Sequence, residues 1–509
     1  MIDDIYQTFE TRVTAHESRP FVRTTEETYT YGQLADRAET FATQFREIGL
    51  EAGDIVGFFL PNSPAFVAAY LGAVRQGITV ACLNTSLRGE SLTHLLDAGG
   101  VETLLSTDDL LEPVADTCTD AGVTSLYSVT ADSDWAALPE GSGETPAPVR
   151  SDDRAIATLV HTSGTTGLPK WCELSHAYLV RLGEFIADGF EISGSDTVFN
   201  PLPLYHINPL GYYLFGGLTA GATLGMVPRF SVSQFWQQVH SLDVTVLILH
   251  MAPKDMIVER TTADDAAGHD VRVMFPADET FMQRYDVPKV VTGYGSTEAG
   301  GLTHLNKFTH APDIPTEEDL SQVAGYPRRD VEVTLVDDDG YEVPQGTNGE
   351  IRIRPRQPGT IFSGYRGAPE NTLDAWEGLW YNTGDIGYLD EAGALHFVER
   401  KADSITHKGE FVNVDLVETL LESHPAVTHA FVVGEPDDVV GERVKAAVRT
   451  ADEIDPAELI EHVASDLPAF MIPEFVDVID RVPRLEGTEK VDRTALRERS
   501  REHAWRRPD

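Results

Sequence analysis

The sequence predicts an α/β protein in which helices flank parallel sheets, divided into more than one domain, and two observations lead to this prediction. Short apolar runs typical of buried strands alternate with stretches of helical spacing. Such alternation is characteristic of parallel sheets covered by helices. The chain has 509 residues, more than one hydrophobic core accommodates, so two or more domains are expected.

The first elements follow one another through short connections. Residues 32–48 have helical spacing, 55–60 suit a strand, 64–74 a helix and 78–82 a strand. Residues 130–149 are rich in Ser, Gly, Pro and acids, which predicts an exposed loop between subdomains. An apolar run at 156–160 then predicts another buried strand.

A helix is expected next, because Tyr178, Leu182 and Ile186 fit one of its faces. Residues 211–225 predict a further helix, whose small residues suit either tight packing or the wall of a ligand pocket. Tyr212, Tyr213 and Phe215 within it could narrow such a pocket or stack on a cation.

The pattern restarts on a smaller scale after about residue 402. Residues 415–423 and 456–465 suit helices, and 430–434 and 445–448 suit strands. This predicts a compact domain of about 100 residues that combines helices and strands. The expected domains are therefore 1–402 and 403–509, joined by one short link that permits rotation.

The charge and the cysteine content of the chain limit the cellular environment and the partners that it suits. The chain has 82 acidic and 39 basic residues, a formal net charge of −43. Such an excess suggests a halophilic protein kept soluble by charge repulsion, and it disfavours a nucleic-acid partner. Three well-separated cysteines without a CxxC pair suggest buried thiols in a reducing compartment.

No targeting or membrane segment is expected. The acidic N-terminus lacks a signal-peptide pattern. No stretch reaches the roughly 18 apolar residues of a membrane helix. We therefore expect a cytoplasmic protein.

The segment TSGTTGLPK, residues 162–170, follows the strand at 156–160. Its hydroxyls, backbone N–H groups and lysine suit a polyanion, and Gly164 and Gly167 allow close backbone approach. It is not a Walker A loop, because Lys170 does not follow a glycine. The segment is either a phosphate-binding loop or an ordinary Ser/Thr/Gly turn.

Other motifs favour phosphate binding. NPLPLYHI (200–207), GYGSTEAG (293–300), NTGDIGYLD (382–390), ERKADSITHKGEF (399–411) and EKVDRTALR (489–497) follow in order. Together with TSGTTGLPK they resemble the signatures of the adenylate-forming superfamily, which includes acyl-CoA synthetases, peptide-synthetase adenylation domains and luciferases. The resemblance spans nearly the whole chain. It implies a large N-terminal domain of αβ-sandwich subdomains and a β-barrel-like subdomain, with a small mobile C-terminal α+β domain.

The resemblance also implies roles for individual residues. Tyr294 would stack on adenine, Asp385 and Arg400 would contact the ribose, and Thr297 the α-phosphate. Glu298 would coordinate Mg²⁺, for which a carboxylate is a suitable hard ligand. The β and γ phosphates of ATP would be held by the loop residues Thr162, Ser163, Gly164, Thr165, Thr166, Gly167 and Lys170.

Lys490 matches the superfamily's catalytic lysine, which bridges the carboxylate and the α-phosphate. The surrounding segment is one residue longer than usual and has Glu489 where glycine is common, a variant familiar in crotonobetaine/carnitine-CoA ligases. A solvated lysine is the alternative. Glu489 could help keep Lys490 charged.

A second half-reaction on CoA would require the C-terminal domain to swing. Gly409 in HKGEF matches the segment brought to the site for thioester formation, and Asp403 matches the hinge position. His206 occupies the position that gates the acyl pocket, with a structural histidine beside Tyr205 as the alternative. The candidate cations for binding the CoA phosphates are Lys401, Lys408, Arg443 and Lys445.

The resulting hypothesis is an ATP-dependent acyl-CoA ligase that activates a fatty or carnitine-like acid as acyl-AMP and transfers it to CoA. An adenylating enzyme with a carrier-protein or amine acceptor, and a non-catalytic homologue, remain alternatives. The non-catalytic alternative is motivated by residues 274–278, which replace the superfamily's usual adenine turn. The partners are a carboxylic acid, ATP and CoA, with Mg²⁺ as cofactor.

Overall fold

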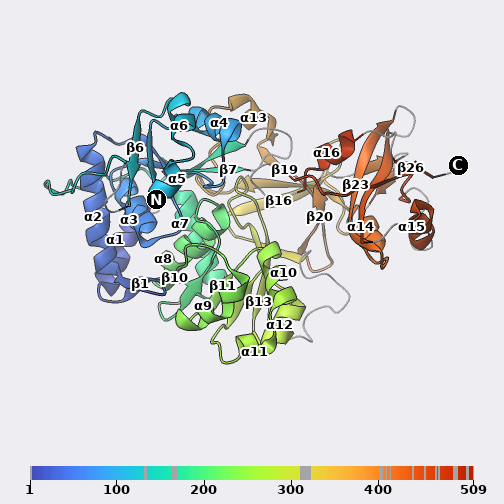
Figure 1. The fold of residues 1–509 in the computed structure, drawn as a ribbon, viewed down its shortest axis with the longest axis horizontal. Helices are drawn as coiled ribbons and strands as arrows, with labels where there is room; N and C mark the ends of the chain where they lie inside the picture. The colour runs from blue at the N-terminus through green and yellow to red at the C-terminus, as the bar shows by residue number, and fades with distance from the viewer. Residues whose placement is uncertain are drawn as a thin grey trace.

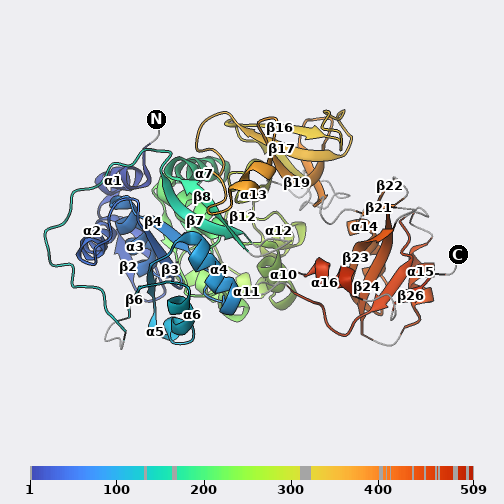
Figure 2. The same ribbon diagram turned by 90° about the horizontal axis from the view of Figure 1, so that it is seen from above.

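The computed structural model describes residues 3–130, 135–162, 169–309, 323–400, 405–407, 410–412, 414–437, 441–451, 454–464, 467, 471–484, 491–499 and 504–507. Two helix-flanked sheets and an antiparallel region form the large N-terminal part (Figure 1). A smaller sheet follows at the opposite end of the molecule, where Figure 2 shows it separated from the first helices.

The first sheet runs in the order β6-β5-β3-β4-β7-β8. All neighbours are parallel except β7 and β8, which form an antiparallel pair. Apart from the edge strand β6, its strands are fully or largely buried, as expected for a sheet covered on both faces. Their bounds are β3 Ile55–Phe59, β4 Thr79–Cys82, β5 Thr103–Ser106, β6 Ser125–Ser128, β7 Ile156–Thr162 and β8 Lys170–Ser175.

The second sheet is parallel from β1 to β13, in the order β1-β10-β9-β11-β12-β13, with antiparallel neighbours β2 and β14 at its two ends. The bounds are β1 Pro20–Arg23, β2 Thr28–Thr30, β9 Thr197–Phe199, β10 Thr223–Gly225, β11 Val246–Ile248, β12 Val273–Phe275, β13 Val290–Tyr294 and β14 His304–Phe308.

An antiparallel region continues from β14 in the order β15-β20-β19-β17-β16. It is the barrel-like part expected from the motifs. Its strands are β15 Val323–Pro327, β16 Val331–Val336, β17 Gly349–Pro355, β18 Trp376–Glu377, β19 Trp380–Leu389 and β20 Leu395–Arg400.

Several helices of the large part begin at capping residues. Thr30 and Gln33 form a capping box on α2, and Ser63 caps α3 ahead of Pro64 at its first position. The bounds are α1 Ile5–His16, α2 Tyr31–Glu47, α3 Pro64–Arg75, α4 Gly89–Gly99, α5 Asp108–Leu111, α6 Ala115–Asp120, α7 His176–Gly189, α9 Phe235–Ser241, α10 Met251–Arg260, α11 Ala263–Ala266, α12 Glu279–Tyr285 and α13 Pro369–Asp374, with a 3₁₀ turn at Val232–Gln234.

The helix expected over 211–225 differs from the prediction. A π-helix, η1, covers Asn208–Phe215 and continues as α8, Gly216–Ala220. Gly221 then takes a left-handed conformation (φ +71°), which ends the helix, and β10 follows. The remaining expected strands and helices of the first 200 residues form within one or two residues of the predicted bounds, and residues 135–149 form neither helix nor a regular strand.

The C-terminal sheet has the order β22-β21-β24-β25-β26, with β23 also paired to β24. Its strands are β21 Ile405–His407, β22 Glu410–Val412, β23 Val427–Asp437, β24 Gly441–Thr450, β25 Phe475–Val478 and β26 Trp505–Arg506; its helices are α14 Val414–Glu422, α15 Pro456–Val463 and α16 Arg493–Glu498. A core of its own packs α14 and α15 on this sheet. The predicted boundary at residues 402 and 403 lies outside the described residues and stays a prediction.

All three cysteines are buried free thiols, as expected. In the described part of the chain, no helix is both long and apolar enough to cross a membrane.

Candidate functional site

The predicted phosphate loop leaves and re-enters the sheet at one point. Thr162 ends β7 and Lys170 begins β8, and the two residues are partners in the antiparallel register. The loop residues Ser163, Gly164, Thr165, Thr166 and Gly167 lie outside the described residues. The hairpin therefore fixes both ends of the loop close together at the edge of the first sheet.

Main-chain hydrogen bonds join β8 to the segment that precedes α13. The Glu173 N–H donates to the Gly364 carbonyl at 2.9 Å, and the Ser363 N–H donates to the Glu173 carbonyl at 2.8 Å. A third bond, 2.9 Å long, runs from the Arg366 N–H to the Trp171 carbonyl. These bonds place Tyr365 directly beside β8.

Tyr365 links two of the predicted site residues. Its hydroxyl donates to Glu298 Oε1 at 3.0 Å. Lys170 Nζ lies 5.4 Å from the centroid of its ring, within cation–π range. Burial, and then the charge of Glu298, raises the pKa of Tyr365, so that its hydroxyl stays a donor.

Glu298 is half-buried and its carboxylate is held by a neutral donor. Besides Tyr365, the uncharged thiol of Cys172 on β8 lies near this carboxylate; burial and then the charge of Glu298 raise the pKa of Cys172. Among the described ion pairs, none involves Glu298 or Lys170. A carboxylate held only by uncharged groups retains its capacity for a cation.

The turn that carries Glu298 requires its small residues. A Cβ on Gly295 would lie 1.9 Å from the Gly301 carbonyl oxygen, so a side chain there would prevent the turn from closing. The Ser296 side chain accepts from the Ala299 N–H at 3.2 Å. The carbonyl of Thr297 accepts from the Tyr178 hydroxyl of α7 at 2.7 Å.

Tyr294 and Asp385 are in direct contact. Tyr294 ends β13, Asp385 lies in β19, and the tyrosine hydroxyl donates to Asp385 Oδ2 at 2.7 Å. Both are buried, at 8% and 4% exposure. Phe397 stacks on Tyr294 with ring centroids 6.1 Å apart. The strand register places Arg400 opposite Asp385.

A continuous chain of contacts therefore joins four predicted residues. It runs from Lys170 through Tyr365 to Glu298, along the turn to Tyr294, and across to Asp385. The four residues come from three separate motifs. Tyr365, which completes the chain, and Cys172, which lies near Glu298, were not identified from sequence; a tyrosine in FSGYRG and a cysteine after the loop lysine carry no motif of their own.

His206 is exposed, at the end of a loop before η1. Its ring packs on Tyr205 with centroids 4.5 Å apart, as expected for the structural alternative, while its exposure leaves it accessible to a ligand. Asn62 holds the loop: it donates to the Leu202 carbonyl at 2.9 Å and accepts from the Leu204 N–H at 2.9 Å. Sequence inspection gave no indication of Asn62.

His161 immediately precedes the loop and is buried between Trp171 and Tyr205. Burial, with a smaller effect of His206, lowers its pKa to about 3. The ring is therefore neutral near neutral pH.

The aromatic residues of η1 are packing groups. Tyr213 and Phe215 are each 1% exposed, and the Tyr213 hydroxyl donates to the Gly225 carbonyl at 2.9 Å. Tyr212 contacts the edge of Phe275. For Tyr213 and Phe215 the expectation of a cation-stacking role is wrong, because both rings lie in the core.

One expected CoA contact, Lys445, is wrong, and a second, Arg443, already has partners of its own. Lys445 is fully buried, and its ammonium donates to the Arg499 carbonyl at 2.7 Å. Arg443 forms ion pairs with Asp437 and Glu474. Both cations are therefore engaged within the C-terminal unit. Lys401, Asp403, Lys408, Gly409, Glu489 and Lys490 and the side chain of Arg400 lie outside what the structure describes.

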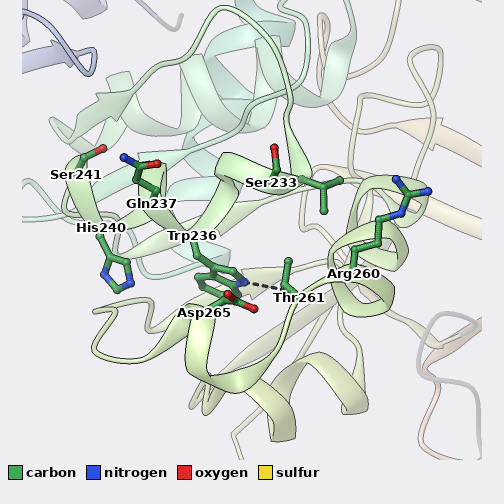
Figure 3. Close-up of a pocket in the computed structure, with 9 residues that line it drawn as sticks. Ser233, Trp236, Gln237, His240, Ser241, Arg260, Thr261 and Asp265 are labelled. Atoms are coloured by element: carbon green, nitrogen blue, oxygen red, sulfur yellow. Dashed lines mark hydrogen bonds between the residues drawn. The ribbon is translucent and has the colours of Figure 1, made fainter.

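A surface hollow of about 700 Å³ lies elsewhere, among α9, α10 and α11 (Figure 3). Trp236 forms its floor and donates to Thr261 Oγ1 at 3.0 Å. None of the predicted motif residues lines it.

Comparison with known proteins agrees with this geometry. The AMP-binding enzyme family model matches residues 9–366, and the model of the AMP-binding enzyme C-terminal domain matches 416–490. Similar sequences include 4-coumarate–CoA ligase 3 of Oryza sativa subsp. japonica, at 30% identity over 93% of this chain and 88% of the relative. Crotonobetaine/carnitine–CoA ligase of Salmonella typhi is 27% identical over 90% of each chain.

Solved structures share the fold over almost the whole chain. o-Succinylbenzoate coenzyme A synthetase of Bacillus subtilis, in complex with ATP and a magnesium ion, is 26% identical with a TM-score of 0.83, covering 96% of this chain and 99% of that one. ATP-bound MatB of Rhodopseudomonas palustris, at 23% identity and a TM-score of 0.83 over 97% and 98%, has the same fold. With its motifs, its fold and a family match over most of its length, the chain belongs to the AMP-binding enzyme family.

Proposed function

We propose that this protein is an ATP-dependent acid–CoA ligase that forms an acyl-AMP and then an acyl-CoA. The observation that carries the proposal is the contact chain from Lys170 through Tyr365 and Glu298 to Tyr294 and Asp385. It groups a cation, an uncompensated carboxylate and a buried carboxylate, which suit the phosphates, metal and ribose of a nucleotide.

The ATP contacts follow from this arrangement. Thr162, Ser163, Gly164, Thr165, Thr166, Gly167 and Lys170 hold the β and γ phosphates through hydroxyls, N–H groups and one ammonium. Asp385 accepts from the ribose hydroxyls, since a carboxylate has acceptor capacity beyond its bond to Tyr294. We assign Tyr294 to adenine and Arg400, opposite Asp385 on the neighbouring strand, to the ribose.

Glu298 suits a divalent cation by its chemistry. Mg²⁺ prefers oxygen ligands and binds through one or two carboxylates together with substrate phosphates. When bound, the ion neutralises phosphate charge as the acid attacks. Glu298 is held by the uncharged Tyr365 hydroxyl, which leaves its negative charge for the cation, and Thr297 on the same turn would contact the α-phosphate.

The barrier to the first step is electrostatic. A carboxylate must approach an anionic triphosphate, and a new acyl–phosphate bond forms as pyrophosphate leaves. Lys490 supplies positive charge between the two reacting groups. AMP then becomes the leaving group when a thiolate of CoA attacks the acyl carbonyl.

The remaining residues would act in the second step, the transfer of the acyl group to CoA. Rotation of the C-terminal domain removes Lys490 and brings Gly409 to the site, where its lack of a side chain admits the pantetheine arm. His206, exposed on a loop fixed by Asn62, lines the approach to the carbonyl.

For the acid, we propose a fatty or carnitine-like carboxylate. The Thr-Glu-Lys-Val sequence around Lys490 supports the carnitine-like class. The named relatives act on acids as different as 4-coumarate and crotonobetaine, so an aromatic acid belongs in any test.

The test is AMP release from a panel of fatty, aromatic and betaine acids, with and without CoA, in molar potassium chloride. The proposal expects acid-dependent AMP release that CoA accelerates, and its loss in Lys490→Ala with ATP binding retained. CoA-independent turnover that a carrier protein or an amine accelerates would favour the alternative acceptors. ATP binding without turnover on any acid would favour a non-catalytic homologue.

A further inference from the structure

The Glu298 carboxylate depends on a neighbour that belongs to none of the recognised motifs. Its Oε1 accepts from the Tyr365 hydroxyl at 3.0 Å. Tyr365 is supplied by the segment before α13, about seventy residues further along the sequence. The main-chain bridge between Cys172 and Tyr365 fixes where that segment lies.

Tyr365 is itself fixed on several sides. Its backbone N–H donates to Thr372 Oγ1 at 2.9 Å. The Phe362 ring packs against it edge-on, with centroids 5.0 Å apart. The Phe362 N–H in turn donates to the Glu298 carbonyl at 3.1 Å. The hydroxyl therefore reaches Glu298 from a rigid position rather than from a free side chain.

The same residue contacts the predicted phosphate-binding cation. Lys170 Nζ lies 5.4 Å from the Tyr365 ring centroid, and no described carboxylate forms an ion pair with it. An aromatic face attracts an ammonium without neutralising it. Tyr365 thus holds a carboxylate with its hydroxyl and a cation with its ring, while both charges stay available to a ligand.

We propose that Tyr365 is a positioning residue that orients Glu298 toward the divalent cation and Lys170 toward the phosphates of the bound nucleotide. The inference rests on the proposed function, in which Glu298 coordinates Mg²⁺. The two contacts of Tyr365 can be tested separately, because its hydroxyl bonds to the metal ligand whereas its ring contacts the lysine.

The experiment uses two substitutions in the full-length protein. Tyr365→Phe removes the hydroxyl and retains the ring, whereas Tyr365→Leu removes both. Calorimetric titration measures Mg²⁺ binding to the protein saturated with ATP, and ATP binding in the presence of a chelator. Tyr31→Phe is the matched control, because the Tyr31 hydroxyl is buried on the Ala222 carbonyl at 2.8 Å, away from the site.

Loss of a group that orients a metal ligand typically weakens metal binding by 10- to 100-fold. We expect Tyr365→Phe to weaken Mg²⁺ binding about tenfold while metal-free ATP binding stays within twofold of the wild type. Tyr365→Leu should in addition weaken metal-free ATP binding by about fivefold. Tyr31→Phe should change neither. An unaltered Mg²⁺ isotherm in Tyr365→Phe would overturn the proposal.

A double-mutant cycle with Glu298→Gln separates this inference from the proposed function. If Tyr365 acts through Glu298, the effect of Tyr365→Phe on Mg²⁺ binding should vanish in the Glu298→Gln background. Equal, additive losses in both backgrounds would contradict the positioning role. Failure of the proposed function has a different signature, since the wild type would then bind ATP and Mg²⁺ but release no AMP with any acid.

Discussion

Two tyrosine–carboxylate pairs mark the two ends of the site, and they differ in their surroundings. Tyr294 donates to Asp385 at 2.7 Å between strands, where Asp385 is only 4% exposed. Tyr365 donates to Glu298 at 3.0 Å at a turn, where Glu298 is half-buried. The strand-held pair suits neutral hydroxyl groups of a ligand, whereas the turn-held carboxylate suits a cation. The two hydrogen bonds are thus similar, but the two carboxylates suit different ligands because one lies between strands and the other at a turn.

The largest effect is expected from breaking the buried pair. Asp385→Asn removes the charge that strengthens bonds to the ribose hydroxyls, each worth about 1.5–3 kcal/mol. We expect kcat/KM for ATP to fall about a hundredfold or more, with the Mg²⁺ dependence unchanged. Asp390→Asn is the control, because Asp390 accepts from the Ala394 N–H at 2.8 Å in the following turn. The measurement is steady-state kinetics with varied ATP. Equal effects of the two substitutions would contradict the assignment of Asp385 to the ribose.

Breaking the half-buried pair, Tyr365 and Glu298, should have a smaller, metal-dependent effect. Glu298→Gln keeps the shape of the side chain and removes the charge that Mg²⁺ requires. We expect the rate at low Mg²⁺ to fall roughly thirtyfold, with partial recovery as Mg²⁺ is raised. Glu173→Gln on β8, whose partner is Arg366, is the control. A rate loss that no Mg²⁺ concentration reverses would argue for a structural role of Glu298.

Removing one donor tests whether the buried pair is preorganised. Tyr294→Phe leaves Asp385 Oδ2 without its 2.7 Å donor. A buried acceptor that loses its partner costs about 1–3 kcal/mol, so unfolding by urea should occur at lower concentration. KM for ATP should rise about fivefold, because Asp385 is less firmly oriented. Tyr213→Phe removes an equally buried hydroxyl, and it should lower stability without changing KM.

The smallest effect concerns pH, and it involves a histidine at each end of the site. Burial lowers the pKa of His304, which contacts Tyr294, and of His161, which precedes the loop, to about 3 each. Unfolded histidines bind protons below about pH 6.5 whereas these do not, so stability should be lost as pH falls from 6.5 toward 3.

At pH 5.5 each of these histidines should cost about 1 kcal/mol of unfolding free energy relative to pH 7.5. The measurement is urea unfolding across this range. His304→Leu should reduce the pH slope, whereas replacing the exposed His240 by Gln should not. A slope unaltered by His304→Leu would show that other groups control acid unfolding.

The sequence predicted the fold class, and the structure joins four of the predicted site residues, Lys170, Glu298, Tyr294 and Asp385, in one chain of contacts. The alternation of apolar runs predicted β3, α3, β4 and β7 closely, since burial on both faces leaves a clear pattern. Tyr294, Glu298 and Asp385 were identified, but the bond between Tyr294 and Asp385 was not. They are 91 residues apart, and only strand packing brings them together.

The residues that sequence inspection missed support others rather than carrying a motif. Tyr365 and Asn62 act through side-chain hydrogen bonds to residues far away in the sequence. Lys445 was misjudged for a related reason: a basic residue in an acidic chain suggests an anion site, yet the strand places it in the core. The end of η1 and α8 at Gly221 depended on one backbone conformation that no periodicity reveals.

The main-chain bonds between β8 and residues 363–366 determine which parts of the molecule are free to move. Separating the phosphate hairpin from residues 363–366 would break at least three such bonds at once. The hairpin and that segment are therefore expected to move as one unit. In the proposed function, the rearrangement between adenylation and thioester formation would then fall to the chain beyond β20, so substitutions there should alter the balance of the two half-reactions while nucleotide affinity stays constant.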